Sequence, residues 1–227
     1  KNDMQNVLTK ISGEAKFELL IFLVLALIPL VFSGYILFIL PQYMLFGLLA
    51  VSLSILWGLT GIISFGQAGF FAIGAYAIGI VVKSTFLMNS AILGILLGII
   101  VSAVIAGVVG YFLFSAKVKA TYFVLATLAL SIIIEQLAKS QKEITGGWNG
   151  LFVDRISISF GNLLEYSLFN DIPMYYFTLL LTITAYALIK FLTTSNFGKI
   201  LRGIRENEDR ILALGYDTSI YKTLIFC

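Results

Sequence analysis

Long apolar runs separated by short polar stretches fill the chain from residue 19 onward. No charged residue occurs from Leu19 to Val82, and at about 20 residues per membrane-spanning helix this run holds three spans. The turn-prone stretches Pro41-Gln42 and Gly58–Ser64 divide the run. The pattern therefore predicts three spanning helices, at residues 19–39, 43–60 and 64–82.

The second half of the chain continues this pattern. An uncharged run predicts a fourth span at residues 91–114, and a fifth runs from about Ala120 to Glu135. A sixth is predicted at residues 172–192, where Pro173 falls in the first turn and removes no helical hydrogen bond. Residues 218–227 are expected to begin a seventh. The predicted fold is an all-α polytopic membrane protein, a bundle of about six complete transmembrane helices plus the start of a seventh.

Composition supports a membrane protein and argues against an enzyme. Of 227 residues, 59% are hydrophobic and 12% charged, whereas about a quarter are charged in soluble proteins. The chain has no histidine and one cysteine, Cys227, so the usual metal ligands, a disulfide framework and His-based catalysis are missing. The only Gly-Lys pair, Gly198-Lys199, lacks the other residues of a phosphate-binding loop. No catalytic residue, metal or cofactor is expected, and the net charge of +3 gives no reason to expect nucleic acid.

The distribution of Lys and Arg predicts which side of the membrane each loop faces. With the N-terminus inside, eleven of these residues fall on the inner side and four, Lys83, Lys139, Lys142 and Arg155, on the outer side; basic residues favour the cytoplasmic side. This assignment requires the span at 64–82 to cross fully. The expected organisation is a cytoplasmic lead at 1–18, a transmembrane bundle at 19–192 with an external loop at 139–171, and a cytoplasmic segment at 193–217.

Small residues at four-residue spacing predict where helices pack closely. Gly94 and Gly98 form a GxxxG pattern, and three further pairs repeat it: Ala75 with Gly79, Ala103 with Gly107, and Ala106 with Gly110. Such spacing lets helix backbones approach closely in lipid. The alternative is that small residues only fill the membrane helices. Either interpretation predicts a tight bundle.

The third predicted span has an unusual composition, with six glycines and Gln67 between Gly58 and Val82. Each glycine weakens a helix by about 1 kcal/mol, and a buried amide needs hydrogen-bond partners. These features predict a broken or closely packed helix that lines a polar path, with polar residues added by the fifth span. The alternative is that Gln67 bonds a neighbouring helix. The candidate path residues are Gly66, Gln67, Gly69, Gly74, Thr127 and Ser131.

One long polar segment, Thr193–Tyr216, interrupts the apolar sequence. It interleaves four basic with three acidic residues and keeps an apolar set at helical spacing. A segment of this kind fits a membrane surface and offers a docking face to a soluble partner. Asn207 is predicted to cap a second short helix, with Glu208 and Asp209 in its first turn and Gly215 at its end. A solvated surface loop is the alternative.

Three separated motifs resemble the membrane permeases of branched-chain amino acid ABC importers. They are WGLTGIISFGQAGFFAIGAYA (57–77), ATYFVLATLAL (120–130) with TGGWNGL (145–151), and SNFGKILRGIRENEDRILALGYDTSIYK (195–222), in the family's order and approximate spacing. The chain is more similar to the permease with an R-x-I-R-E-N-E string, here Arg202–Glu208, than to its partner permease.

The resemblance implies a subunit of the cytoplasmic (inner) membrane of a prokaryote that pairs with a second permease, two cytoplasmic ATPases and an external substrate-binding protein. It implies import of branched-chain or other hydrophobic amino acids, with ATP hydrolysed by the separate ATPases. The residues that it assigns to ATPase coupling are Lys199, Arg202, Arg205, Glu206, Asn207, Glu208, Leu214 and Gly215. Those that it assigns to contact with the binding protein are Thr145, Gly146, Gly147 and Asn149.

The chain departs from the family in two places. The broader coupling signature of ABC importers begins with Glu-Ala-Ala, where this chain has Asp209-Arg210-Ile211, and similar permeases continue for several more spans, so a truncated chain is expected. Alternative functions are an ABC permease for urea or short amides, an ion-coupled secondary transporter of a small polar solute, and a purely structural subunit. The secondary transporter would use Gln67 and Glu135, although the position of Glu135 near the end of its span favours an interfacial carboxylate.

Overall fold

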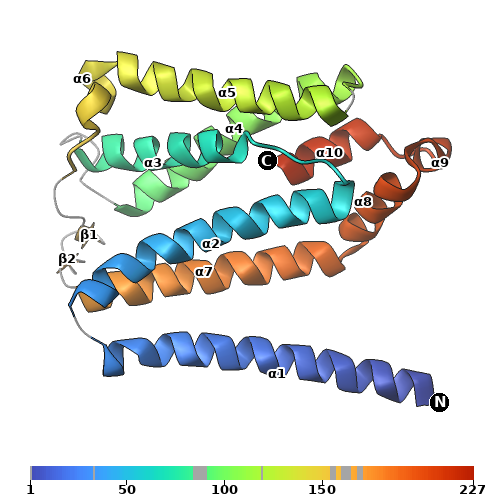
Figure 1. Ribbon diagram of the computed structural model, residues 1–227, viewed down its shortest axis with the longest axis horizontal. Helices are drawn as coiled ribbons and strands as arrows, with labels where there is room; N and C mark the ends of the chain where they lie inside the picture. The colour runs from blue at the N-terminus through green and yellow to red at the C-terminus, as the bar shows by residue number, and fades with distance from the viewer. Residues whose placement is uncertain are drawn as a thin grey trace.

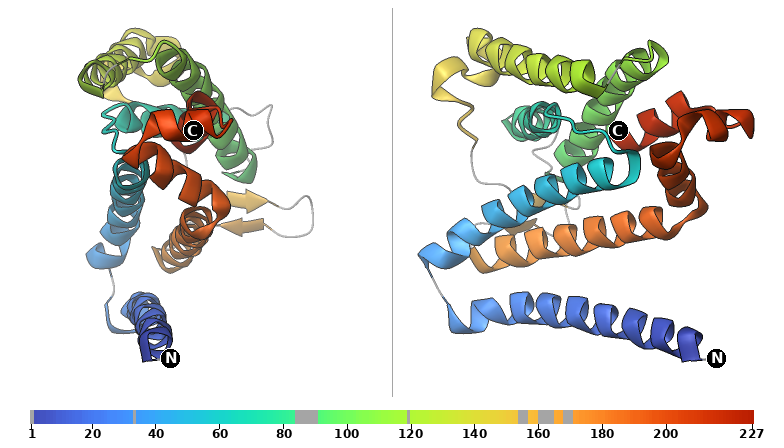
Figure 2. Two further views of the ribbon diagram at one scale, coloured as in Figure 1. Left: turned by 90° about the vertical axis from the view of Figure 1, so that its right-hand side faces the viewer. Right: turned by 45° about the vertical axis from the view of Figure 1, so that its right-hand side comes forward.

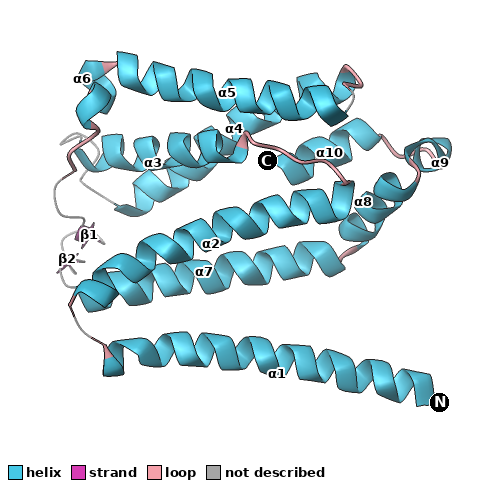
Figure 3. Ribbon diagram, viewed as in Figure 1, coloured by secondary structure: helices cyan, strands magenta, loops and turns pink. Residues whose placement is uncertain are grey.

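The apolar runs of the sequence form helices, because a helix satisfies its backbone hydrogen bonds internally where no water is present. The computed structural model describes residues 2–32, 34–83, 91–118, 120–153, 157–159, 165–167 and 171–227. Figure 3 shows that helix is the dominant structure, which confirms the all-α class. The elements are α1 (Asn2–Val31), α2 (Tyr35–Thr60), α3 (Gln67–Lys83), α4 (Ala91–Ser115), α5 (Ala120–Ser140), α6 (Lys142–Thr145), η2 (Gly147–Asn149), β1 (Ser157–Ser159), β2 (Glu165–Ser167), α7 (Asp171–Thr194), α8 (Asn196–Glu206), α9 (Glu208–Ala213) and α10 (Thr218–Phe226).

Successive long helices alternate in direction, so the bundle has two distinct ends (Figure 1). The N-terminus, the α2–α3 and α4–α5 connections, and α8 with α9 lie at one end, which we call the polar-segment end. The α1–α2 turn, the end of α3, α6 and the antiparallel β1–β2 hairpin lie at the opposite end. The right-hand view of Figure 2 shows the same separation. This arrangement agrees with the predicted grouping of basic residues, of which Lys1, Lys119 and Arg155 lie outside the described residues.

Four helices within the described residues are long and apolar enough to cross a membrane: α2, α4, α5 and α7. The fourth and sixth predicted spans match α4 and α7 closely, and α5 continues beyond its predicted end to Ser140. α3 has 17 residues and is preceded by non-helical residues 61–66. Figure 1 shows that residues 61–66 and α3 together lead from the polar-segment end to the opposite end, as the third predicted span requires.

The predicted break at Pro41-Gln42 is wrong, because α2 continues through Pro41. The break occurs instead just before Tyr35, where Gly34 has φ 68. This left-handed region favours glycine because a residue with a Cβ is strained there. Pro41 is the seventh residue of α2, beyond the first turn, and is buried; interior prolines are tolerated in membrane helices when neighbouring groups satisfy the freed carbonyl. The first two predicted spans therefore fall on α1, which ends at Val31, and on α2, and of these two only α2 is among the four helices named above.

Part of the small-residue pattern lies where helices approach closely. A β-carbon at Gly98 would lie 3.0 Å from the carbonyl oxygen of Gly74, and one at Gly94 would lie 3.2 Å from the Cα of Ile78. α3 and α4 therefore pack backbone against backbone at this GxxxG pattern. A β-carbon at Gly110 would lie 2.7 Å from the ring of Phe226. The absence of a side chain at Gly110 therefore lets α10 pack closely against α4.

Two apolar clusters position the polar segment and the middle of the bundle. Leu201 and Ile204 of α8 pack on Leu59 near the end of α2, so the apolar stripe of this short helix is buried as predicted. A second cluster joins α4, α5 and α10 through Phe114, Phe123 and Phe226; the Phe114 and Phe123 rings stack with centroids 4.8 Å apart. The two clusters meet at the polar-segment end, where the cavity described below lies.

Candidate functional site

The break before α3 brings polar groups into the middle of the bundle. Ser64 and Thr127 are buried, with exposed fractions of 1% and 0%. The backbone N–H of Phe65 donates to the Thr127 hydroxyl at 3.3 Å, and the Ser131 hydroxyl donates to the Phe65 carbonyl at 2.8 Å. The Ser64 hydroxyl accepts from the N–H of Gly66 at 3.1 Å. Side chains of α5 thus satisfy backbone groups that the broken helix leaves open.

Glycines make this approach possible. A β-carbon at Gly66 would lie 3.2 Å from the Cβ of Thr127, and one at Gly69 would lie 2.9 Å from Ile134 and 3.1 Å from the Ser131 hydroxyl. Contacts this short require the neighbours to shift. The structure therefore brings four of the predicted path residues together: Gly66, Gly69, Thr127 and Ser131. Gly74 lies further along α3 and faces Ser102 of α4, at 3.3 Å from its hydroxyl.

Gln67 begins α3 and belongs to the same break. Its Oε1 atom is buried and has no hydrogen-bond partner among the described residues. An unpaired buried amide oxygen is costly in an apolar environment. The alternative that Gln67 bonds a neighbouring helix is therefore not what this oxygen does.

The polar segment folds into two short capped helices, as predicted. The Ser195 hydroxyl accepts from the N–H of Gly198 at the start of α8, and the Asn207 side chain accepts from the N–H of Arg210 at 2.9 Å at the start of α9. Gly215 has φ 88, and its N–H donates to the Leu212 carbonyl at 2.9 Å, which ends α9. The solvated-loop alternative does not describe this compact pair of helices.

Two arginines of α8 attach the segment to the spanning helices. The Arg205 guanidinium donates to the Gly58 carbonyl of α2 at 2.6 Å, and that of Arg202 donates to the Thr193 carbonyl of α7 at 2.9 Å. Both contacts place a positive charge near a helix C-terminus, where it interacts favourably with the helix dipole. The sequence alone did not indicate that these two predicted coupling residues hold α8 against α2 and α7.

Glu208 connects α9 to α10. Its Oε1 atom lies 2.6 Å from Lys222 Nζ and accepts from the Thr218 hydroxyl at 2.7 Å. Burial raises the pKa of the Glu208 carboxyl, but hydrogen bonds from Lys222 and Thr218 and the charge of Lys117 outweigh burial and hold the pKa below its ordinary value. Glu208 is therefore ionised at neutral pH and links α9 to α10.

The remaining predicted coupling residues are exposed. Glu206, Asn207, Leu214 and Gly215 lie on the corner around α9, which we call the tip (residues 206–216), and Figure 1 shows it protruding from the polar-segment end. Leu214 is 67% exposed and Tyr216 is 41% exposed. Lys199 is exposed on α8, and its amine donates to the Asn196 side chain at 3.3 Å. The tip thus offers apolar and charged groups to a partner.

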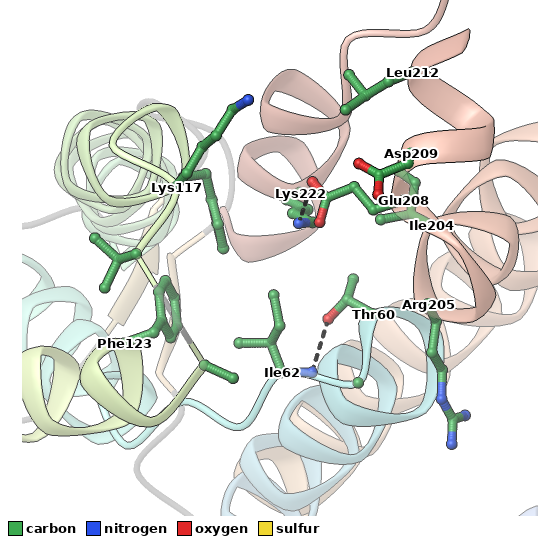
Figure 4. Close-up of a pocket in the computed structure, with 14 residues that line it drawn as sticks. Thr60, Ile62, Lys117, Phe123, Ile204, Arg205, Glu208, Asp209, Leu212 and Lys222 are labelled. Atoms are coloured by element: carbon green, nitrogen blue, oxygen red, sulfur yellow. Dashed lines mark hydrogen bonds and ion pairs between the residues drawn. The ribbon is translucent and has the colours of Figure 1, made fainter. Parts of the chain in front are cut away.

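A cavity of about 540 Å³ lies between the polar segment and the bundle. Its walls come from the end of α2, the α4–α5 connection, and α8 to α10 (Figure 4). Ile62, Val118 and Phe123 supply apolar walls, and the charged residues in its lining are Lys117, Arg205, Glu208, Asp209 and Lys222. The sequence gives no local signal for this cavity, because its residues are far apart along the chain.

The glycine-rich motif after α5 forms a tight turn at the opposite end. Gly146 and Gly147 have φ 78 and 63, and a β-carbon at Gly146 would collide with the Gly150 carbonyl at 2.0 Å. The Thr145 hydroxyl donates to carbonyls of Ala138 and Gln141. Three of the four residues predicted to contact a binding protein therefore shape the turn, while Asn149 is exposed beside Trp148, which is 76% exposed.

Comparisons with known proteins identify the family. The family described as "Branched-chain amino acid transport system / permease component" matches residues 35–227. This chain belongs to that family. The permease is 28% identical over 202 residues to the "Probable branched-chain amino acid transport permease protein LivM" of Methanocaldococcus jannaschii, an alignment that covers 76% of this chain and 57% of the relative. No solved structure matches the chain.

Sequence reasoning found some of the permease's residues that meet at the break before α3 and missed others. The membership makes the chain a transporter component rather than an enzyme, and the resemblance on three motifs is confirmed. Ser64 and Ser102 were not predicted, although Ser102 donates to the Phe70 carbonyl at 3.2 Å. The signal for Ser64 was available, because a serine two residues before a glycine in a non-helical stretch often bonds the glycine N–H.

Glu135 is not a buried mid-membrane carboxylate in this permease. Its side chain is 60% exposed and pairs with Lys139 one turn later on α5, and the Lys139 amine lies 4.6 Å from the Trp148 ring centroid. A proton carrier needs a carboxylate shielded within the protein. The geometry therefore supports the interfacial interpretation.

Proposed function

We propose that this chain is a transmembrane permease subunit of an ATP-driven ABC importer that translocates branched-chain or other hydrophobic amino acids. In this proposal an external binding protein delivers the substrate, a second permease completes the membrane unit, and two separate ATPases supply the energy. The membrane is the cytoplasmic membrane of a prokaryote, and the N-terminus and polar segment face the cytoplasm. The chain spans 57% of the length of its relative.

The observation that supports this proposal most strongly is the anchored polar segment. Leu201, Arg202 and Arg205 fix α8 on the ends of α2 and α7, while the tip remains exposed. A rigid connection to the bundle together with an exposed corner is what a force-transmitting contact needs. A partner that binds the tip moves α8, and α8 in turn bears on the end of α2, directly before the broken third span.

The break before α3 is the proposed translocation path. Gly66, Gly69, Thr127 and Ser131 hold an irregular backbone at membrane depth, where such backbone persists only when it is buried in protein or lines a cavity. The unpaired Gln67 oxygen is the proposed acceptor for a polar group of the passing substrate. Discontinuous helices bind polar groups of substrates in other transporters.

The test compares two matched double variants. Glu206→Ala with Leu214→Ala removes one acidic and one exposed apolar side chain from the tip. Glu143→Ala with Ile144→Ala removes the same types at the opposite end, where Ile144 is 54% exposed. Arg205 and Glu208 are kept, because their loss detaches the segment and would confuse anchoring with docking.

The expected result is loss of ATPase co-purification and of ATP-driven leucine uptake only for the tip variant. Membrane insertion, measured as the amount of folded protein extracted, should match the wild type for both. An ATPase that co-purifies equally with both variants would remove the tip from the contact. Uptake that stops when an ion gradient is collapsed while ATP is held constant would favour a secondary transporter, and uptake of urea alone would change the substrate.

A further inference from the structure

The cavity between the polar segment and the bundle has the chemistry of a ligand site. Its volume of about 540 Å³ falls within the range of small-molecule sites. The path residues Gly66, Gly69, Thr127 and Ser131 are not in its lining. It lies at the polar-segment end and is walled by parts of the chain that are far apart in sequence.

Most of the charge in the lining is already paired. Glu208 pairs with Lys222, whose side chain is 13% exposed, and the Arg205 guanidinium donates to the Gly58 carbonyl. Two charged side chains of the lining make neither an ion pair nor a hydrogen bond among the described residues, Lys117 on the α4–α5 connection and Asp209 on α9, although the charge of Lys117 also acts on Glu208. Figure 4 shows them on opposite sides of the cavity. One unpaired positive and one unpaired negative group therefore face the same space.

Lys117 has an unusual backbone. It has φ 49, the only positive φ of a non-glycine residue in the described part of the chain. This left-handed conformation costs a residue with a Cβ about 1 kcal/mol, and strained residues cluster at functional sites. Its side chain is a compact positive charge on a flexible four-carbon stem.

We propose that this cavity binds a free α-amino acid with an apolar side chain, whose carboxylate pairs with Lys117 and whose ammonium pairs with Asp209. The side chain packs on Ile62, Val118 and Phe123. A zwitterion fits these two groups better than a phosphate dianion, which would pair with Lys117 but leave Asp209 facing a like charge. The choice of an apolar amino acid rests on the proposed function.

Occupation of this site has a mechanical consequence. The bound amino acid joins α9 to the α4–α5 connection and so stabilises the present position of the polar segment against movement. A ligand that binds one arrangement better shifts the population toward it. Product that accumulates on this side of the membrane would therefore slow the transport cycle, through a site separate from the path.

The binding test uses the purified complex of the chain with its partner subunits in lipid nanodiscs and four probes. Leucine has both charges and an apolar side chain, leucinol lacks the carboxylate, 4-methylpentanoate lacks the ammonium, and glycine lacks the side chain. The variants are Lys117→Gln, Asp209→Asn and the cavity-filling Val118→Trp. Arg210→Gln is the control, because Arg210 neighbours Asp209 on α9 but is not in the cavity lining. Lys117→Gly removes the charge and also relieves the backbone strain, so comparison with Lys117→Gln separates the effect of the charge on leucine affinity from the effect of the strain.

Leucine affinity should fall about tenfold or more for Lys117→Gln and Asp209→Asn, the loss expected for a charged hydrogen bond, and Val118→Trp should abolish binding. Leucinol should respond to Asp209→Asn but not to Lys117→Gln, and 4-methylpentanoate should show the reverse. Equal leucine binding by all variants overturns the proposal, as does binding of inorganic phosphate in place of leucine.

The same preparation is assayed for ATP-driven uptake. Absent uptake with variant-sensitive leucine binding refutes the proposed function alone, and intact uptake with variant-insensitive binding refutes the cavity site alone.

Discussion

Replacement of Leu201 by alanine tests how firmly the polar segment is anchored. Leu201 is 0% exposed and packs on Leu59 and Ile204, which are 6% and 4% exposed. A buried leucine replaced by alanine costs about 2–5 kcal/mol, because apolar contact is lost and a cavity remains. If the whole of this free energy is lost from the attachment of α8, the population of the detached segment rises by about 30-fold to several thousandfold.

Leu214→Ala is the matched control, since Leu214 belongs to the same segment but is 67% exposed. Its truncation should change the free energy of unfolding by less than about 0.5 kcal/mol.

Amide hydrogen exchange of α8 in the purified complex measures the difference. Exchange should accelerate strongly for Leu201→Ala and by about twofold at most for Leu214→Ala. In contrast, both variants should weaken ATPase coupling, Leu201→Ala by releasing the segment and Leu214→Ala by removing a contact at the tip. Equal α8 protection in the two variants would refute the conclusion that buried apolar contact holds the segment in place.

Two further predictions concern the path and the α9–α10 link. Gly69→Ala should lower the free energy of unfolding of the purified protein by about 1–3 kcal/mol and impair uptake, because the added β-carbon would lie 2.9 Å from Ile134. Gly47→Ala is the control: its β-carbon meets nothing within 4 Å, so the free energy of unfolding should stay the same or rise by up to about 1 kcal/mol. A larger loss of stability for Gly47→Ala than for Gly69→Ala would contradict the packing argument. Glu208→Gln should lower the melting temperature at pH 7. Because the folded pKa of Glu208 is depressed, its stabilising contribution is present above the ordinary glutamate pKa and lost as the pH falls through the folded value, so the gap between wild type and variant should close below about pH 4. A gap that persists in acid would mean that Glu208 does not act through its charge.

Much of the fold was predictable because lipid imposes a simple length rule. Uncharged runs of about 20 residues must be helical, and α4 and α7 follow the predicted spans closely. The prediction at Pro41-Gln42 failed because a membrane helix tolerates an interior proline when neighbouring groups satisfy the freed carbonyl, while the positive φ of Gly34 marks the actual break. Backbone conformation at a single glycine is a local property that hydropathy does not report.

The candidate site was predictable only where its contacts are local. Asn207 and Gly215 cap and end α9 as their chemistry requires, and Thr127 and Ser131 share one face of α5 because they are four residues apart. Pairing between distant segments was not predictable. Ser131 bonds the carbonyl of Phe65, 66 residues earlier, and only the packed bundle brings them within 2.8 Å.

The sequence by itself determined that this protein is a bundle of membrane helices with one polar segment, and its motifs indicated the permease family. Apolar run length, capping residues and motif order are properties of neighbouring residues, so they need no tertiary structure. Only the tertiary structure decided what the charged residues of the segment do. Arg202, Arg205 and Glu208 bond carbonyls and side chains of other helices, because helix packing places unsatisfied helix ends and a lysine within their reach, and this leaves the tip and the cavity for other molecules.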